Sequence, residues 1–109
     1  MQISTRTIND VHIVAIAGNL DSSTSPEAQK ALDAVLAGAR TVAIDFTDLD
    51  YISSAGLRVL LGAAKQLRAS GGTLRMFGLN QSVREVFEIS GFSTILPVYP
   101  SQAEALGAR

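Results

Sequence analysis

The sequence predicts an α/β fold in a single domain spanning residues 1–109, with about five strands in a mixed, mostly parallel sheet and about four helices. Strand-like apolar segments alternate along the chain with segments whose apolar residues recur at helical spacing. A chain of 109 residues suits one domain with one core, and 47% hydrophobic residues indicate a packed domain. Strands that alternate with helices favour parallel pairing and a layered architecture.

The chain opens with a predicted β-hairpin. Residues 3–8 and 11–17 form two strand-like segments. Asn9 and Asp10 lie between them, and both residue types tolerate the positive φ that a two-residue hairpin turn requires. Gly18 ends the second strand.

A helix follows the hairpin. Ser25 is expected to be its N-cap, and Pro26 suits the first helical position. Gly38 is expected to end it. The apolar residues at helical spacing are Ala28, Ala31, Leu32, Val35 and Leu36.

The middle of the chain predicts a buried strand at residues 42–46, followed by a loop that extends to Tyr51. From Ser54 the pattern changes to a helical period, and the glycines at 71–72 are expected to end this second helix. Its apolar positions are Leu57, Leu60, Leu61, Ala64 and Leu67.

The last third predicts a strand within residues 73–79 and another at residues 94–98. The helix between them is expected to be capped by Asn80, or by the serine that opens a Ser-x-x-Glu capping box at 82–85. A second pattern of this kind at 101–104 predicts a short terminal helix.

Composition bears on several classes of function. The net charge is −1, so the chain lacks the basic excess typical of nucleic-acid-binding proteins. The chain has no cysteine, which excludes disulfides and thiolate metal sites and is compatible with a cytoplasmic location. We expect no signal peptide and no membrane span, because no apolar run approaches about 18 residues.

The residues give little support for catalysis, metal binding or a cofactor. A Gly-x-Ser-x-Gly motif is absent and His12 is the only histidine, so we expect no catalytic residues. Asp45, Asp48 and Asp50 lack the glycine and terminal glutamate of an EF-hand, which favours a solvated loop over a metal site. Neither a Walker nor a dinucleotide-binding motif occurs.

Two adjacent serines mark the start of the second predicted helix. Ser53 and Ser54 are good N-caps, but one serine is enough for capping. The second hydroxyl is therefore available to accept a phosphate beside free backbone N–H groups, and Gly56 adds little bulk nearby. From the residues alone, a plain cap and a phosphorylation site both stay open.

The segments "GNLDSSTSPE", "IDFTDLDYISSAGLRVLL" and "VREVFEISGF" resemble the STAS domain family, over nearly the whole chain. The resemblance to its stand-alone anti-sigma factor antagonists implies partner switching without enzymatic activity. The unmodified antagonist binds an anti-sigma factor that is also a serine protein kinase, and this releases the sigma factor. Phosphorylation of the antagonist dissociates the complex, and a metal-dependent serine/threonine phosphatase then removes the phosphate. The resemblance implies that Ser54 is the phosphoacceptor and that Asp21 lies beside it.

The match departs from the family pattern beside the acceptor. Ser53 stands where the family has an aspartate, and Ala55 replaces a serine or threonine. Ser53 is therefore an alternative acceptor. The departure also leaves open a scaffold subunit of a signalling or lipid-transport complex that does not switch. Arg58, four residues after Ser54, is expected to pair with the phosphoserine.

We expect the partner-binding surface around Ser54, because loops at the carboxyl ends of parallel strands form the usual binding crevice of such sheets. The surface is predicted to comprise Asp21, Ser22, Thr47, Asp48, Tyr51, Ser53, Ser54, Ala55, Gly56, Leu57 and Arg58.

Overall fold

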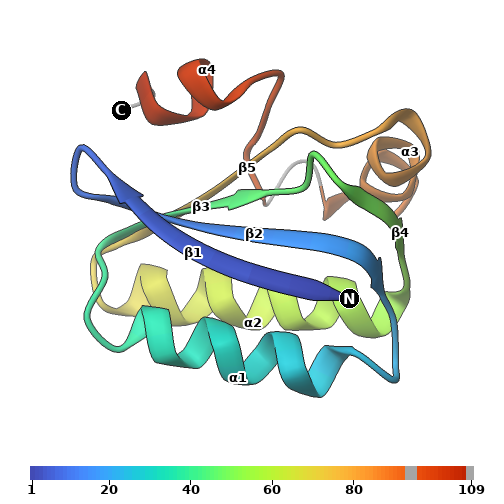
Figure 1. The fold of residues 1–109 in the computed structure, drawn as a ribbon, viewed down its shortest axis with the longest axis horizontal. Helices are drawn as coiled ribbons and strands as arrows, with labels where there is room; N and C mark the ends of the chain where they lie inside the picture. The colour runs from blue at the N-terminus through green and yellow to red at the C-terminus, as the bar shows by residue number, and fades with distance from the viewer. Residues whose placement is uncertain (93–95, 108–109) are drawn as a thin grey trace.

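A computed structural model describes residues 1–92 and 96–107 of the chain. Over these residues, six strands form one mixed sheet with four helices around it (Figure 1). The strands are β1 (Gln2–Ile8), β2 (Val11–Leu20), β3 (Thr41–Asp45), β4 (Leu49–Ile52), β5 (Thr73–Phe77) and β6 (Val98–Tyr99). The helices are α1 (Ser25–Leu36), α2 (Ser54–Ala69), α3 (Gln81–Ile89) and α4 (Gln102–Gly107). The predicted fold class is confirmed.

The sheet has the order β1-β2-β3-β5-β6, and β1 alone is antiparallel to its neighbour. Asn9 and Asp10 have φ values of 50° and 66°, which confirms the predicted hairpin turn. The long strand β2 pairs in parallel with β3 along its first half and with β4 along its second half. The change of partner coincides with a register irregularity between Gly18 and Asn19.

The two faces of the sheet are covered unequally. Helices α1 and α2 lie side by side along one face of the sheet (Figure 1). Most of the core is packed between these helices and the sheet. The short helix α4 lies against the other face. Because β2 alternates, Val14 and Ile16 enter the main core while Val11 and Ile13 enter the smaller cluster below α4.

Strand β4 is the main element that the sequence does not predict, because the predicted loop after residues 42–46 extends to Tyr51. Only Leu49 and Ile52 of its four residues are buried, and Asp50 and Tyr51 are exposed. So short a strand shows no period-two pattern, and its neighbouring aspartates suggest a turn. At the end of the chain, the described strand is Val98–Tyr99, whereas residues 94–95 of the predicted strand lie outside the described residues.

The predicted helix ends are confirmed in part. Ser25 is not the N-cap of α1: Thr24 holds that position, and the Ser25 hydroxyl donates to the Asp21 carbonyl instead. Asn80 caps α3, because its Oδ1 accepts from the Val83 amide at 2.8 Å. The capping box at 82–85 is therefore wrong, since Ser82 already lies inside the helix.

The other predicted helix ends agree with the structure. The helix α1 ends just before Gly38, and α2 ends just before Gly71, whose φ is 84°. The Ser101 hydroxyl accepts from the Glu104 amide at 3.2 Å, as expected for a serine that caps α4.

Candidate partner-binding and modification site

The start of α2 is attached to the end of β2. The Ser53 amide donates to the Leu20 carbonyl at 2.9 Å, which continues the pairing of β4 with β2 by one further bond. Ser53 is extended, with φ −99° and ψ 175°, and its Oγ accepts from the Gly56 amide at 3.4 Å. Ser53 is therefore the N-cap of α2, and its hydroxyl serves the fold.

Gly56 allows this close approach of helix and strand. A Cβ atom at position 56 would lie 2.8 Å from Leu20 Cγ, 2.9 Å from Ile52 Cγ1 and 2.9 Å from the Leu20 carbonyl oxygen. Gly56 is thus directed into the protein, and the expectation that it clears space beside an exposed hydroxyl is wrong. Leu57 is also buried in the main core. Both residues position the helix and offer no side chain to a partner, which corrects their inclusion in the contact surface.

Ser54 differs from Ser53 in its surroundings. It is the first residue of α2 and is exposed, whereas Ser53 is half-buried. Within the described residues, the cap of α2 uses the Ser53 hydroxyl and not that of Ser54. An added group at Ser54 would therefore project into solvent without breaking a hydrogen bond of the fold.

Asp21 organises the loop that follows β2. Its Oδ1 accepts from the Ser23 hydroxyl at 2.7 Å, from the Ser23 amide at 2.9 Å and from the Thr24 amide at 3.2 Å. These hydrogen bonds, led by that from the Ser23 hydroxyl, lower the pKa of the Asp21 carboxyl below its ordinary value. The loop leaves β2 at Leu20, to which Ser53 is bonded, so a negative charge at Asp21 lies on the same side of the molecule as Ser54.

Tyr51 presents an aromatic ring beside α3. Its side chain is 52% exposed. A hollow of about 170 Å³ lies on the surface between β4 and α3. It is lined by Asp50, Tyr51, Ile52, Ser82, Val83 and Val86. The sequence analysis missed the α3 side of this hollow because the two segments are about thirty residues apart. A signal was present at Asn80, whose Nδ2 donates to the Leu49 carbonyl at 3.0 Å and ties α3 to β4.

Thr47 and Asp48 are not brought to Ser54. They precede β4, whereas Ser54 follows it, and about 3.3 Å per strand residue places Asp48 on the order of 15 Å from Ser53. The Asp48 carbonyl accepts from the Gly18 amide at 2.9 Å, and the Thr47 amide donates to the Asp45 carboxylate at 2.9 Å. Their inclusion in one surface with Ser54 followed from the predicted loop between residue 46 and Tyr51, and strand β4 instead separates Asp48 from Ser54.

The remaining predicted contact residues lie near Ser54. Ser22 is exposed in the loop after β2, and Arg58 is exposed one helical turn beyond Ser54. Ala55 is half-buried. The predicted contact residues that are exposed or half-buried lie in the segments after β2, at the end of β4 and at the start of α2: Asp21, Ser22, Tyr51, Ser53, Ser54, Ala55 and Arg58.

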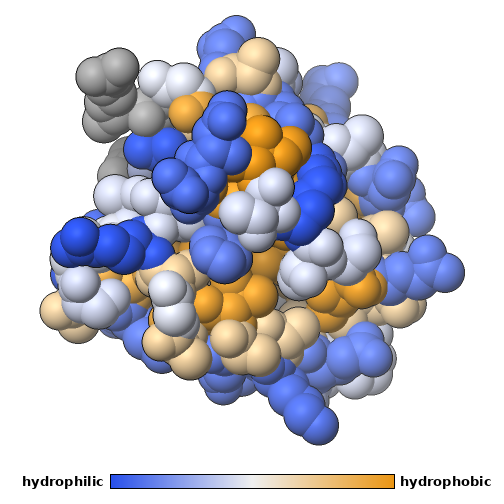
Figure 2. Space-filling model, turned by 60° about the vertical axis from the view of Figure 1, so that its left-hand side comes forward, coloured by the Kyte–Doolittle hydropathy of each residue, from blue (hydrophilic) through white to orange (hydrophobic). Residues whose placement is uncertain are grey.

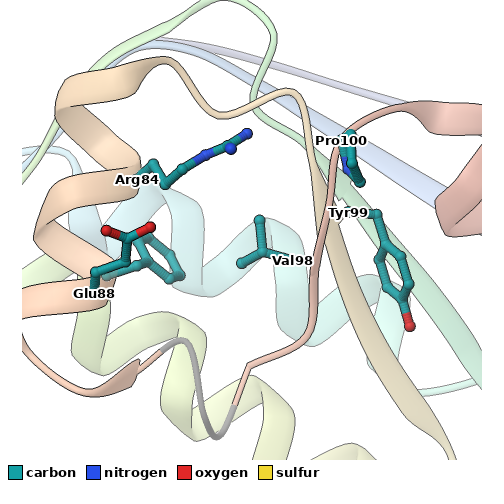
Figure 3. Close-up of a pocket in the computed structure, with 6 residues that line it drawn as sticks. Arg84, Glu88, Val98, Tyr99 and Pro100 are labelled. Carbon is teal, nitrogen blue, oxygen red and sulfur yellow. The ribbon is translucent and has the colours of Figure 1, made fainter.

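A separate hollow of about 180 Å³ lies between α3 and β6, lined by Arg84, Phe87, Glu88, Val98, Tyr99 and Pro100. Val98 points toward α3, whereas the ring of Tyr99 points away from it (Figure 3). The hollow is smaller than typical small-molecule sites, which occupy about 300–1,000 Å³. We assign no ligand to it.

The surface is mixed in character at the end of the molecule that carries the β1–β2 hairpin. Figure 2 brings this end forward and shows hydrophobic patches separated by hydrophilic side chains. At the end of β3, the Asp45 carboxylate lies 3.6 Å from the Arg6 guanidinium and accepts from the Thr47 amide. In residues 1–92 and 96–107, no three His, Cys, Asp or Glu side chains gather as a metal site would require.

Comparison with known proteins defines the family. The profile of the STAS domain matches residues 2–105, and the chain belongs to this family. BtrV of Bordetella bronchiseptica, provisionally named an anti-sigma factor antagonist, is 44% identical over 99% of this chain and 94% of its own. The anti-sigma-B factor antagonist of Listeria monocytogenes is 35% identical over 86% of this chain and 83% of its own. Both relatives are thus named as antagonists of anti-sigma factors, and they support this general role for the family member described here.

Solved structures agree on the fold. A Thermotoga maritima protein provisionally named an anti-sigma factor antagonist superposes with a TM-score of 0.90 at 23% identity, covering 95% of this chain and 91% of its own. An anti-sigma factor antagonist from Mycobacterium paratuberculosis gives a TM-score of 0.89 at 24% identity, covering 96% and 90%. None of the helices in the described part of the chain is long and apolar enough to cross a membrane.

Proposed function

We propose that this chain is a cytoplasmic, non-enzymatic anti-sigma factor antagonist whose binding is switched by phosphorylation at Ser54. The observation that carries the proposal is the division of roles between two adjacent serines: Ser53 caps α2, and Ser54 is exposed. The names of the relatives at 44% and 35% identity support the class of partner. The same fold also occurs in phosphorylated form in the Bacillus protein SpoIIAA, at a TM-score of 0.73 and 18% identity.

In the proposed cycle, the unphosphorylated chain binds an anti-sigma factor that is also a serine kinase, and the sigma factor is released. The Ser54 Oγ then attacks the γ-phosphorus of the kinase's ATP. A new Oγ–P bond forms, the bond from the γ-phosphorus to the bridging oxygen breaks, ADP leaves, and the hydroxyl proton passes to a base of the kinase. A metal-dependent serine/threonine phosphatase hydrolyses the phosphoserine and restores the hydroxyl.

The phosphate would act on docking and leave the fold intact. It adds a charge of about −1.5 to −2 at pH 7 to a surface on which Asp21 is already negative. A dianion buried in an interface costs several kcal/mol unless its whole charge is paired and hydrogen-bonded, which one arginine does not achieve, and each ~1.4 kcal/mol lowers the affinity tenfold. One phosphate is therefore sufficient to end the complex.

The test is intact-mass analysis after incubation with ATP and the candidate anti-sigma kinase. We expect a gain of one phosphate in the wild type and in Ser53→Ala, and none in Ser54→Ala. In binding measurements, Ser54→Ala should hold the anti-sigma factor constitutively and Ser54→Asp should bind weakly. Equal affinity of these two variants would count against the switch. A phosphate found on Ser53 would show that Ser53, and not Ser54, is the phosphoacceptor.

A second function is favoured by one observation, the neutral Ser53 in place of the family's aspartate. A STAS subunit that only holds together a signalling or lipid-transport complex needs no kinase recognition beside Ser54. In that case no phosphate would be gained, and Ser54→Asp would weaken assembly with a neighbouring subunit without any kinase being present.

A further inference from the structure

We propose that Arg58 is the intramolecular partner of phosphorylated Ser54 and holds the phosphate along the surface of α2. This inference rests on the proposed function, since it concerns the phosphorylated state. Arg58 would be a positioning residue that determines where the added charge lies.

The geometry places the two side chains together. Ser54 is the first residue of α2 and Arg58 follows four residues later, so the two lie on one face of the helix, about 6 Å apart along its axis. Both are exposed. An acidic group four residues before a basic one is the favourable order on a helix.

Arg58 is available for this contact. In the part of the chain that the structure describes, its guanidinium takes part in no ion pair or side-chain hydrogen bond. It is also the only Lys or Arg between the start of α2 and Ala64. A guanidinium binds phosphate oxygens through two parallel N–H donors, which a lysine ammonium does not reproduce.

The other charges near the start of α2 are mostly negative. Asp21 lies in the loop after β2, Glu27 in the first turn of α1 and Asp50 on β4, while Lys30 is the basic residue of α1. Repulsion of the phosphate by Asp21 and its attraction by Arg58 act in the same direction. The phosphate is therefore drawn along α2 and away from the Asp21 loop.

The experiment measures the second pKa of the phosphoserine by ³¹P NMR, at about 0.15 M salt. Phosphoserine is introduced at position 54 during translation, so the measurement does not depend on any kinase. In the wild type, Arg58 should stabilise the dianion and lower this pKa below about 6. Arg58→Ala should raise the pKa by about 0.3, and Arg58→Lys should raise it by less.

Lys65→Ala is the matched control. Lys65 is exposed on the same face of α2, eleven residues after Ser54, at about 16 Å along the helix. That distance is twice the Debye length of about 8 Å, so this variant removes the same charge but should leave the pKa unchanged. Far-UV circular dichroism checks that each variant is folded.

Equal pKa values in wild type and Arg58→Ala would overturn the inference, as would equal rises in Arg58→Ala and Lys65→Ala. If instead the pKa responds to Arg58 but no kinase modifies Ser54, the proposed function fails while the pairing stands.

Discussion

Gly56 provides the sharpest test of how the site is built. In Gly56→Ala, the new methyl group would lie 2.8 Å from Leu20 Cγ and 2.9 Å from both Ile52 Cγ1 and the Leu20 carbonyl oxygen. Side chains could rearrange around the first two contacts, but the third is with backbone. The start of α2 must therefore move away from β2.

The magnitude follows from two opposing effects. Overpacking of this kind costs about 1–3 kcal/mol, whereas replacing glycine by alanine inside a helix gains up to about 1 kcal/mol. The balance is a loss of up to about 3 kcal/mol, and its middle value of about 1–2 kcal/mol corresponds to a fall in Tm of about 5–10 °C for a domain of this size. Thermal unfolding followed by circular dichroism measures it.

Gly62→Ala is the control on the same helix. Gly62 is exposed, and a Cβ atom there would meet nothing within 4 Å. This variant should therefore show only the helix gain, a stabilisation of up to about 1 kcal/mol. If both variants raised Tm, the close approach of α2 to β2 would be refuted.

Three further predictions concern the turns and caps. Ser53→Ala should lower the free energy of unfolding by about 0.5–1 kcal/mol in urea titrations, whereas Ser54→Ala should change this free energy by less than about 0.5 kcal/mol. Asn80→Ala removes both the α3 cap and the bond to the Leu49 carbonyl, so a loss of about 1–2 kcal/mol is expected in the same assay. Because the pKa of Asp21 is lowered in the folded state, its contribution to stability is present above pH 3.8 and is lost as the pH falls through the folded value. Asp21→Asn should accordingly lose less stability than the wild type between pH 6 and pH 3, and an equal loss would contradict the predicted role.

The predictable parts of the fold are those with a strong local signal. The hairpin at Asn9–Asp10 and the helix that ends before Gly71 both follow from residue types that few other conformations favour. The N-cap residue of α1 was less predictable. The segment after β2 holds four candidates in residues 22–25, and the helix begins at Ser25 because Asp21 organises the preceding turn.

The candidate site was predictable where it depends on sequence neighbours and not where it depends on pairing. The presence of a capping serine at 53–54 follows from the place of this pair before an apolar helical pattern, and the structure assigns the cap to Ser53. The separation of Asp48 from Ser54 depends on β4, whose pairing with β2 is long-range. The burial of Gly56 depends on that same pairing, because Leu20 and Ile52 meet only when β4 lies beside β2.

The position of β4 bears on whether a group added at Ser54 would leave the fold intact, as the proposed switch requires. One end of this strand is fixed by the Asn80 bond to Leu49 and the other by the Ser53 bond to Leu20. The helix start is thus held by backbone pairing, by the Ser53 hydroxyl and by the space left at Gly56, and none of these uses the side chain of Ser54. The Ser54 hydroxyl takes no part in these contacts, so a change of charge there would leave them in place. The chain therefore concentrates structural demands on Ser53 and Gly56 and leaves the exposed side chain of Ser54, between them, outside the contacts that hold the helix start.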